Sequence, residues 1–347
     1  SFAYQKQLQL LLWQIVRPGQ AFVFGGTWRI PVKHRLLDRG FVQDMRQDGT
    51  FNEASFGREY ESQWSGSMDD AFFNADMFDK YRVLNQPESE FSGRGNADHY
   101  YVFGVDVGRQ GAQTAIMVFK VNPQPKGVGM KSLVNIFTAD SEHFEQQALI
   151  LKRLYYRFMP KAIAVDANGL GAGLVDYLVT KTRDNRTGEE FPPFGVINDE
   201  RGDYRKYYAD QALEGNLLYL IKANAEINNE AHVNVVTQFS SGKVRLMIDE
   251  KTAKAKLLST KMGNDMTPEA RADYMRPFVL TSILKEEMMN LREKREGKNV
   301  VLERANNKIQ KDKFSAFEYG LYYIKILEDS DKKKRGKYRA SDFMFYN

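Results

Sequence analysis

Three consecutive apolar segments in the first half of the chain constrain its fold most. Residues 101–107 and 112–121 each read as a buried strand, and the short glycine-containing turn between them predicts a hairpin. A loop then leads to a third apolar segment, 132–138, which predicts a third strand. Because these three strands follow one another without an intervening helix, we expect them to pair antiparallel, which excludes a plain succession of parallel strands and helices.

The segments that follow alternate between helix and strand. A helical pattern ends at Pro160, a strand follows at 162–166, and a glycine-rich turn then leads into the helical segment "GLVDYLVTK". A strand at 194–197 and a helix over 203–229 complete the order β-β-β-α-β-α-β-α. This order predicts an α/β protein of the ribonuclease H-like fold, a mixed sheet flanked by helices.

Before these segments, the sequence predicts a helix over 4–16, a strand over 21–32 and an amphipathic helix over 52–64. After them, it predicts a hairpin over 233–248 and helices near 268–295 and 305–327. At 347 residues, the chain is long enough for two domains. Its 42% hydrophobic and 27% charged residues are typical of a globular protein, and no apolar run approaches the length of a membrane span. We therefore expect no membrane partner.

The composition restricts the kinds of metal site that are possible. The chain has no cysteine, which excludes disulfides and thiolate zinc sites, and its four histidines are scattered along the sequence. A metal site would therefore have carboxylate ligands, which suit Mg²⁺ or Mn²⁺. The net charge of +5 is compatible with a polyanionic partner.

Asp106 is the one acid in the first predicted strand. A buried carboxylate costs several kcal/mol, about 2 to 7 even for a neutral polar group, unless it is paired. No cation lies on the same strand, and Arg109 comes just beyond it in the turn. The partner of Asp106 must therefore come from elsewhere in the chain, or it must be a metal.

Asp166 is the last residue of the strand 162–166. Ligands of open α/β sheets bind outside the carboxyl ends of the strands, where this side chain would lie. The alternative is that Asp166 only caps the following turn. If it lies beside Asp106 on a neighbouring parallel strand, the two carboxylates cannot both ionise easily without a cation between them.

Asp312 belongs to a helical stripe of otherwise apolar or small residues. Ala316 and Gly320 on this stripe would let the helix lie close to the sheet and bring Asp312 to the same place, whereas Glu318 points away from the stripe. The alternative is that Asp312 is an acid at the edge of a surface stripe. Three carboxylates without sulfur suit a two-metal phosphodiester site, in which Asp106 would bridge the ions.

Basic residues near these acids are candidates for contacts with DNA phosphates. The alternative for each of them is that it is an ordinary solvated surface charge that does not contact DNA. The candidates are Arg109, Arg201, Arg205, Lys311 and Lys313.

Other phosphate-binding motifs are incomplete. The segment "GLGAG" at 169–173 resembles part of a dinucleotide fingerprint, but the acid precedes it, and no P-loop occurs. The segment "GVDVGRQGAQT" is similar to the first phosphate loop of actin-like kinases and Hsp70-type ATPases, but no second phosphate loop or adenosine loop follows.

Three segments, "VFGVDVGRQGAQTAI", "AIAVDANGLGAGLVDYL" and "KDKFSAFEYGLYYI", resemble the nuclease domain of viral large terminases, the DNA-packaging motor subunits of tailed phages. The resemblance covers about 100–327 in order and spacing. It implies that Asp106, Asp166 and Asp312 occupy the metal-binding positions of the family. Many members have a second acid or a histidine near the third Asp, whereas lysines stand there in this chain.

The N-terminal segment "FVFGGTWRIPVKH" is similar to the end of the terminase ATPase domain, but the nucleotide-binding Walker segments are missing. The resemblance implies an ATPase remnant over 1–90, a linker over 91–99, the nuclease domain over 100–328 and a basic and aromatic tail over 329–347. From this chain alone, we expect no ATPase activity.

The function implied is a metal-dependent endonuclease that cuts concatemeric double-stranded viral DNA in the host cytoplasm and is not part of the mature virion. Its implied partners are DNA, the portal protein ring and the terminase small subunit, with an oligomeric ring only on the portal. Two alternatives stay open: a DNA-gripping or portal-docking module without activity, and an actin-like phosphotransferase.

Overall fold

The computed structural model describes part of the chain, which forms two units. The described residues are 26–38, 40–42, 60–61, 72–93, 98–108, 113–124, 128–140, 143–296 and 299–342. By its contacts the chain divides after Ala71, so that residues 72–90, predicted to belong to the ATPase remnant, belong to the second unit. Among the helices in the described ranges, none is both long enough and apolar enough to span a bilayer.

In the first unit, the described residues centre on the short helix α2 (Arg29–Lys33). The backbone nitrogen of Trp28 donates to the carbonyl of Tyr60 at 2.7 Å. The strand expected over 21–32 is wrong where the structure describes it, because Pro31 lies early in a helix, where its missing N–H costs nothing. The helices expected over 4–16 and 52–64 lie outside the described residues, apart from positions 60 and 61.

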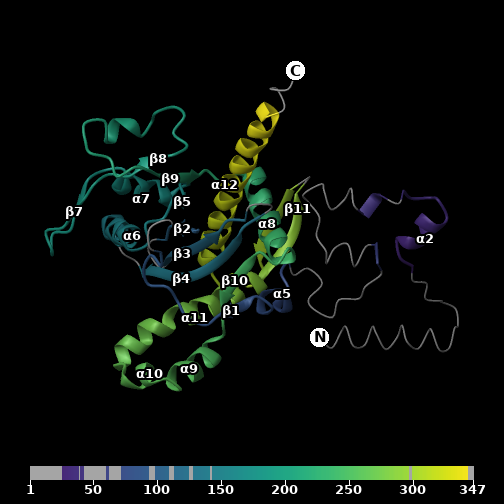
Figure 1. The fold of residues 1–347 in the computed structure, drawn as a ribbon, viewed down its shortest axis with the longest axis horizontal. Coiled ribbons are helices and arrows are strands. Elements are labelled where there is room, and N and C mark those ends of the chain that lie inside the picture. The colour runs from purple at the N-terminus through teal and green to yellow at the C-terminus, as the bar shows by residue number, and fades with distance from the viewer. Residues whose placement is uncertain are drawn as a thin grey trace. The chain divides into compact units, whose positions relative to one another are not determined.

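An eight-stranded mixed sheet forms the centre of the second unit (Figure 1). The strand order is β1-β10-β4-β3-β2-β5-β9-β8, and β3 is antiparallel to both of its neighbours while all other pairs are parallel. The strands are β1 (Arg82–Leu84), β2 (Tyr100–Asp106), β3 (Gln113–Asn122), β4 (Met130–Asp140), β5 (Ala162–Asp166), β8 (Gly195–Val196), β9 (Asn216–Ile221) and β10 (Val244–Met247).

Helices cover both faces of this sheet. Helices α6 and α7 pack on one face, and α8, α11 and α12 pack on the other (Figure 1). Because both faces are buried, the central strands are continuous apolar runs rather than alternating ones. The helices are α6 (Phe144–Phe158), α7 (Leu170–Leu178), α8 (Ala225–Ser240), α11 (Pro268–Met289) and α12 (Asp312–Asp342).

The predicted fold class is confirmed. Strands β2, β3 and β4 form the antiparallel meander, and β5 and β9 join β2 on its other side in parallel, as in a ribonuclease H-like sheet. The strand at 162–166 has its predicted bounds. Asp106 ends β2 and is therefore a strand-end acid like Asp166.

The predicted helix over 203–229 is wrong. The apolar run "NLLYLI" within it is the buried strand β9, because a short apolar run does not distinguish strand from helix by periodicity. The predicted hairpin over 233–248 is also wrong. Its first half belongs to α8, where the Asn224 side chain caps the helix by accepting from the Ile227 nitrogen at 2.9 Å.

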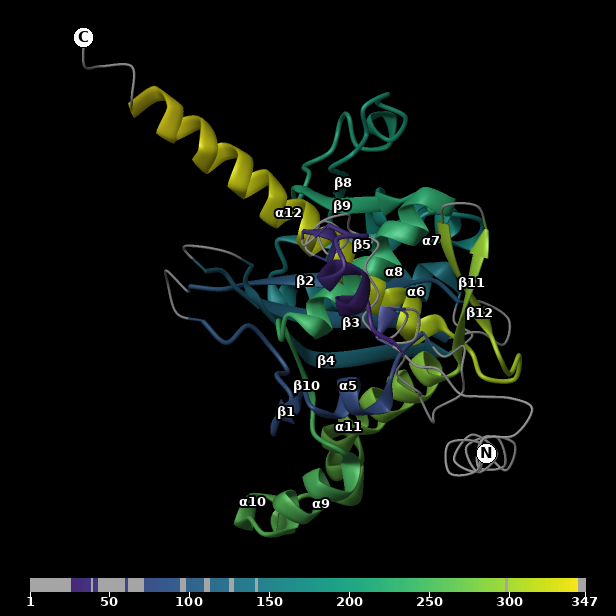
Figure 2. The same cartoon turned by 90° about the vertical axis from the view of Figure 1, so that its right-hand side faces the viewer.

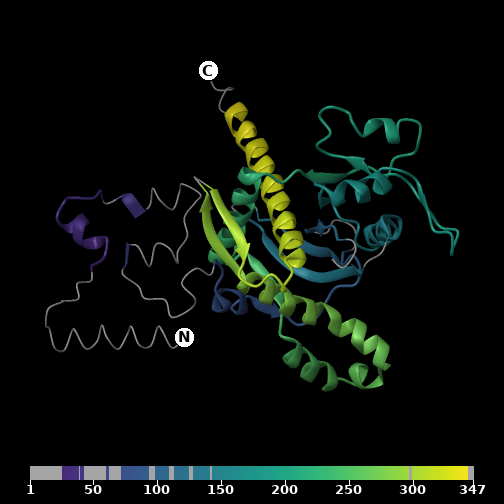
Figure 3. The same cartoon turned by 180° about the vertical axis from the view of Figure 1, so that it is seen from behind.

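The chain after β10 also differs from the prediction. Three helices, α9 (Glu250–Leu258), α10 (Lys261–Asp265) and α11, form an arm that projects from the sheet, drawn in green in Figure 3. A hairpin, β11 (Leu291–Glu296) with β12 (Asn299–Arg304), replaces the last part of the predicted helix over 268–295. Three short elements complete the unit: β6 (Thr182–Arg183) paired with β7 (Glu190–Phe191), the 3₁₀ helix η1 (Arg205–Tyr207) and α5 (Ala75–Asp79).

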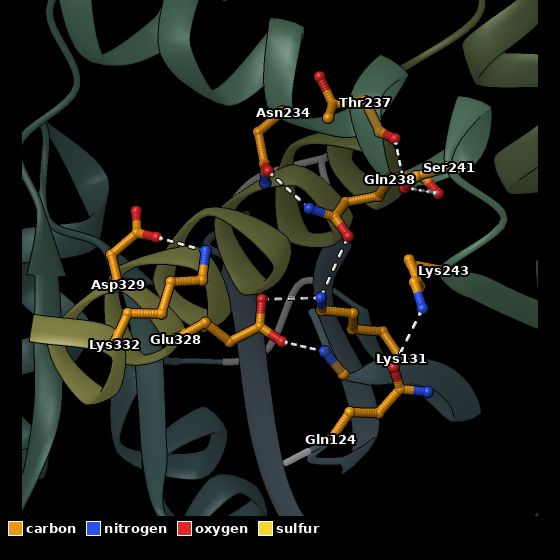
Figure 4. Close-up of polar contacts among 11 residues, drawn as sticks. Gln124, Lys131, Asn234, Thr237, Gln238, Ser241, Lys243, Glu328, Asp329 and Lys332 are labelled. Atoms are coloured by element: carbon orange, nitrogen blue, oxygen red, sulfur yellow. Dashed lines mark hydrogen bonds and ion pairs between the residues drawn. The ribbon is translucent and has the colours of Figure 1, made fainter. Parts of the chain in front are cut away.

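Helix α12 begins at Asp312 rather than 305 and continues to Asp342, so most of the predicted tail is helical. Its C-terminal part extends away from the sheet (Figure 2). Near the point where it leaves, Glu328 accepts from the Gly129 nitrogen at 2.7 Å and pairs with the fully buried Lys131 at 2.8 Å (Figure 4). This pair ties α12 to β4.

Candidate functional site

The ends of two neighbouring strands bring the first two acids together. Strands β2 and β5 are parallel and in register, with Val105 beside Val165, so Asp106 and Asp166 stand at adjacent carboxyl ends. Neighbouring strands lie about 4.8 Å apart. The two carboxyl groups therefore share the edge of the sheet at which α/β proteins bind ligands.

Close packing of α12 on the sheet brings the third acid to the same edge. A Cβ atom on Gly104 of β2 would overlap the carbonyl oxygen of Ala316 and lie 2.7 Å from the backbone nitrogen of Gly320. The helix therefore crosses β2 at backbone distance, as the small residues in its stripe predict. At the start of α12, the Asp312 carboxylate accepts a long hydrogen bond of 3.4 Å from the backbone nitrogen of Gln113.

The charges of Asp312 and Asp166 act on the carboxyl group of Asp106. Burial, followed by the charges of Asp312 and Asp166, raises the pKa of Asp106 well above its ordinary value, while the Lys311 charge opposes this. Burial also raises the pKa of Asp166, against the hydrogen bond that its Oδ1 accepts from the Asn168 nitrogen at 2.9 Å. Asp166 thus makes the predicted capping bond in addition to facing the site.

The chemistry of this donor set fits a hard divalent cation. Within the described ranges, no donor or cation forms a hydrogen bond or an ion pair with the Asp106 carboxylate, and all three candidate ligands offer oxygen. As the side chains stand, no three His, Cys, Asp or Glu side chains in those ranges lie close enough together to hold one ion. Asp312 and Asp166 thus act electrostatically on Asp106, but the three carboxylates do not form an ion-sized site in their present positions.

The structure separates the candidate DNA-contacting residues. Lys311 is exposed and within electrostatic reach of Asp106 and Asp166. Lys313 lies in the interior with 4% exposure, because Glu287 on α11 pairs with it at 3.3 Å, so its ammonium does not reach the surface. We therefore remove Lys313 from the candidate contacts.

Arg201 and Arg205 are exposed on the loop after β8. Because β8 is parallel to β9, and β9 to β5, this loop leaves the sheet at the same edge as Asp166. Arg109 lies outside the described residues.

Several residues near the acids were not predicted as part of the site. Tyr319, one residue after Glu318 on α12, is buried, and burial with the charges of Glu318, Asp166 and Asp106 raises its pKa. The Glu318 carboxylate is buried and lies 2.6 Å from Nδ1 of His232 on α8. Tyr319 stands two helical turns from Asp312, so i+7 spacing could have identified it; no signal in the sequence indicated His232.

The fold is that of an α/β protein with a ribonuclease H-like sheet, and the two strand-end acids Asp106 and Asp166 lie at the carboxyl edge of that sheet. Comparison with solved structures finds the large terminase nuclease of thermophilic phage G20c with bound magnesium, at 12% identity and a TM-score of 0.38, covering 68% of this chain and 92% of that one. The large terminase nuclease domain of Thermus phage P74-26 follows at 13% identity and a TM-score of 0.35, covering 70% and 93%. No family model and no curated protein matches the chain.

Proposed function

We propose that this chain is a divalent-metal-dependent DNA endonuclease of a viral genome-packaging motor. The observation that supports the proposal most is the approach of three acids from β2, β5 and α12 to one sheet edge. Asp106 there is half-buried and has no hydrogen-bond or ion-pair partner within the described ranges. A carboxyl group whose pKa is raised by burial and by the charges of two neighbouring carboxylates is one that a bound cation would stabilise. The motif resemblance to terminase nucleases points to the same activity.

In this proposal, Asp106, Asp166 and Asp312 would hold the metal, and Asp106 would be the shared ligand because it interacts with both of the others. Two ions, Mg²⁺ or Mn²⁺, would activate the attacking water and stabilise the leaving oxygen of the phosphodiester. The chain itself supplies the edge of the sheet and the close packing of α12 against β2, which together position the acids. It also supplies an exposed cation, Lys311, near the acids. Lys311, Arg201 and Arg205 would orient the DNA backbone by contacting its phosphates.

The finer parts of the proposal concern substrate and partners. They are cleavage of concatemeric double-stranded DNA in the host cytoplasm, and binding to the portal ring and the terminase small subunit. Two other functions are alternatives to this proposal. A docking module without activity would bind the portal ring but leave plasmid DNA intact. An actin-like phosphotransferase would bind a nucleotide in calorimetry.

We expect plasmid cleavage to require Mg²⁺ or Mn²⁺ and to show little sequence preference, because the candidate ligands are carboxylates. The measurement is conversion of supercoiled plasmid to nicked and linear forms, with and without excess EDTA. Restoring the activity by adding Mn²⁺ in excess over EDTA is the control. Cleavage that persists in EDTA would contradict the metal mechanism.

We expect DNA binding to weaken steeply with salt, since phosphate contacts release counterions. Changing Arg201, Arg205 or Lys311 to Ala should each lower the slope of log Kd against log salt by roughly one unit. Lys161, exposed at the opposite end of β5, is the matched control, and Lys161→Ala should leave the slope unchanged. A slope unaltered in the triple variant would place the DNA elsewhere.

A further inference from the structure

Helix α12 begins without a capping side chain of its own. The first intrahelical hydrogen bond runs from the Ser315 nitrogen to the Lys311 carbonyl at 2.8 Å, which makes Lys311 the N-cap residue. A lysine side chain has no acceptor and cannot cap a backbone N–H. The free N–H groups of the first turn, which carries Asp312, are therefore not satisfied by the side chain of the N-cap residue.

Glu287, near the end of α11, supplies an acceptor for one of these N–H groups. Its Oε2 accepts from the backbone nitrogen of Phe314 at 2.9 Å, the N–H that an N-cap side chain ordinarily satisfies. The Glu287 side chain is 2% exposed, and burial raises its pKa to about 7 although the Lys313 charge opposes this. Its charged form interacts favourably with the positive end of the helix. The cap of α12 thus comes from a different helix.

The other contacts of Glu287 close a network around Asp312. Its Oε1 lies 3.3 Å from the Lys313 ammonium, which also donates to Oε1 of Gln113 at 3.1 Å. Gln113 is the residue whose backbone nitrogen faces the Asp312 carboxylate. The two residues after Asp312 and the residue opposite it are therefore held, directly or through Lys313, by Glu287.

We propose that Glu287 is a positioning residue for the metal site: by capping α12 from α11 and pairing with Lys313, it holds Asp312 at the edge shared with Asp106 and Asp166. The inference rests on the proposed function, in which Asp312 is a metal ligand. Both oxygens of Glu287 are directed to Lys313 and Phe314, so it acts through these residues and is not a ligand itself.

The test compares two double variants that leave no buried charge unpaired. E287Q/K313M keeps an amide oxygen to accept from the Phe314 nitrogen, whereas E287L/K313M removes that acceptor. Replacing a buried ion pair by groups of similar volume generally preserves the fold. Mn²⁺ binding to the full chain is measured by calorimetry, and by the resonance signal of free Mn²⁺, without DNA.

We expect E287L/K313M to weaken Mn²⁺ binding by about tenfold or more, and E287Q/K313M to stay within about threefold of wild type, as for residues that orient metal ligands. The matched control is K131M/E328L. It removes the same kind of lysine–glutamate pair from the middle of α12, where the Glu328 side chain likewise accepts from a backbone N–H, that of Gly129 (Figure 4). It should lower the melting temperature but leave Mn²⁺ affinity unchanged.

Mn²⁺ affinity in E287L/K313M within twofold of wild type would overturn the inference. An equal loss in K131M/E328L would also overturn it, since the effect would then be a general loosening of α12. Wild-type protein that binds no Mn²⁺ would contradict the proposed function itself, and the inference with it.

Discussion

Changing Asp106, Asp166 or Asp312 to Asn is expected to lower the rate of plasmid cleavage by about a thousandfold or more. Metal ions contribute several kcal/mol to the stabilisation of the transition state, and each 1.36 kcal/mol corresponds to a factor of ten in rate. An amide has no charge with which to hold the ion, so each substitution should remove that contribution. Asp176→Asn, at an exposed position of α7, is the control and should cleave like wild type.

The same variants should remain folded, which separates a role in the site from a role in the core. In EDTA, Asp106→Asn should melt at the same temperature as wild type or higher, because burial and the neighbouring carboxylates raise the pKa of Asp106. Between the ordinary pKa of 3.8 and the raised value, the folded state binds more protons than the unfolded state. The Asp106 contribution therefore stabilises the wild type as the pH falls through that range.

Thermal unfolding of wild type and Asp106→Asn over a pH series, in EDTA, measures this contribution. We expect the difference in melting temperature between Asp106→Asn and wild type to shrink as the pH is lowered. A variant that is less stable than wild type at neutral pH would show that the carboxylate serves the core. Cleavage at the wild-type rate in all three Asn variants would remove these acids from the mechanism.

Gly104→Ala is expected to destabilise the protein by at least about 3 kcal/mol, at the upper end of the cost of overpacking. The added Cβ would overlap the carbonyl oxygen of Ala316 and stand 2.7 Å from the backbone nitrogen of Gly320. Because these are backbone atoms, a change of rotamer cannot relieve the overlap, and α12 must move away from β2. The displacement would carry Asp312 away from Asp106 and should also lower the rate of cleavage.

Urea unfolding measures the loss of stability, and plasmid cleavage measures the loss of activity. The control is the double variant G104A/A316G. It should be no more stable than Gly104→Ala, because the overlap involves the carbonyl of Ala316 and not its methyl group. Recovery in the double variant, or wild-type stability in Gly104→Ala, would contradict the backbone contact between α12 and β2.

Local patterns in the sequence predicted the part of the fold that carries the acids. The apolar runs that form β2, β3 and β5 are bounded by turns and are buried on both faces, so their identity depends on their own residues. The small residues Ala316 and Gly320 predicted that their helix packs closely on the sheet, but not on which strand. The structure shows that this strand is β2. That Asp106, Asp166 and Asp312 hold a metal stays a prediction.

Only the tertiary structure decided which way the lysines beside Asp312 face. It also decided the conformation of the segments between the correctly predicted strands and helices. Strand β9 was predicted as helix because a short apolar run takes its conformation from its neighbours, here β5 and β8. Lys311 and Lys313 flank Asp312 alike in the sequence, yet one is exposed and the other is buried against Glu287. Helical periodicity identifies a face but not what packs on it. The sequence therefore indicated β2 to β5 and the three candidate acids, whereas only the tertiary structure showed β9 beside β5 and Glu287 of α11 beside the start of α12.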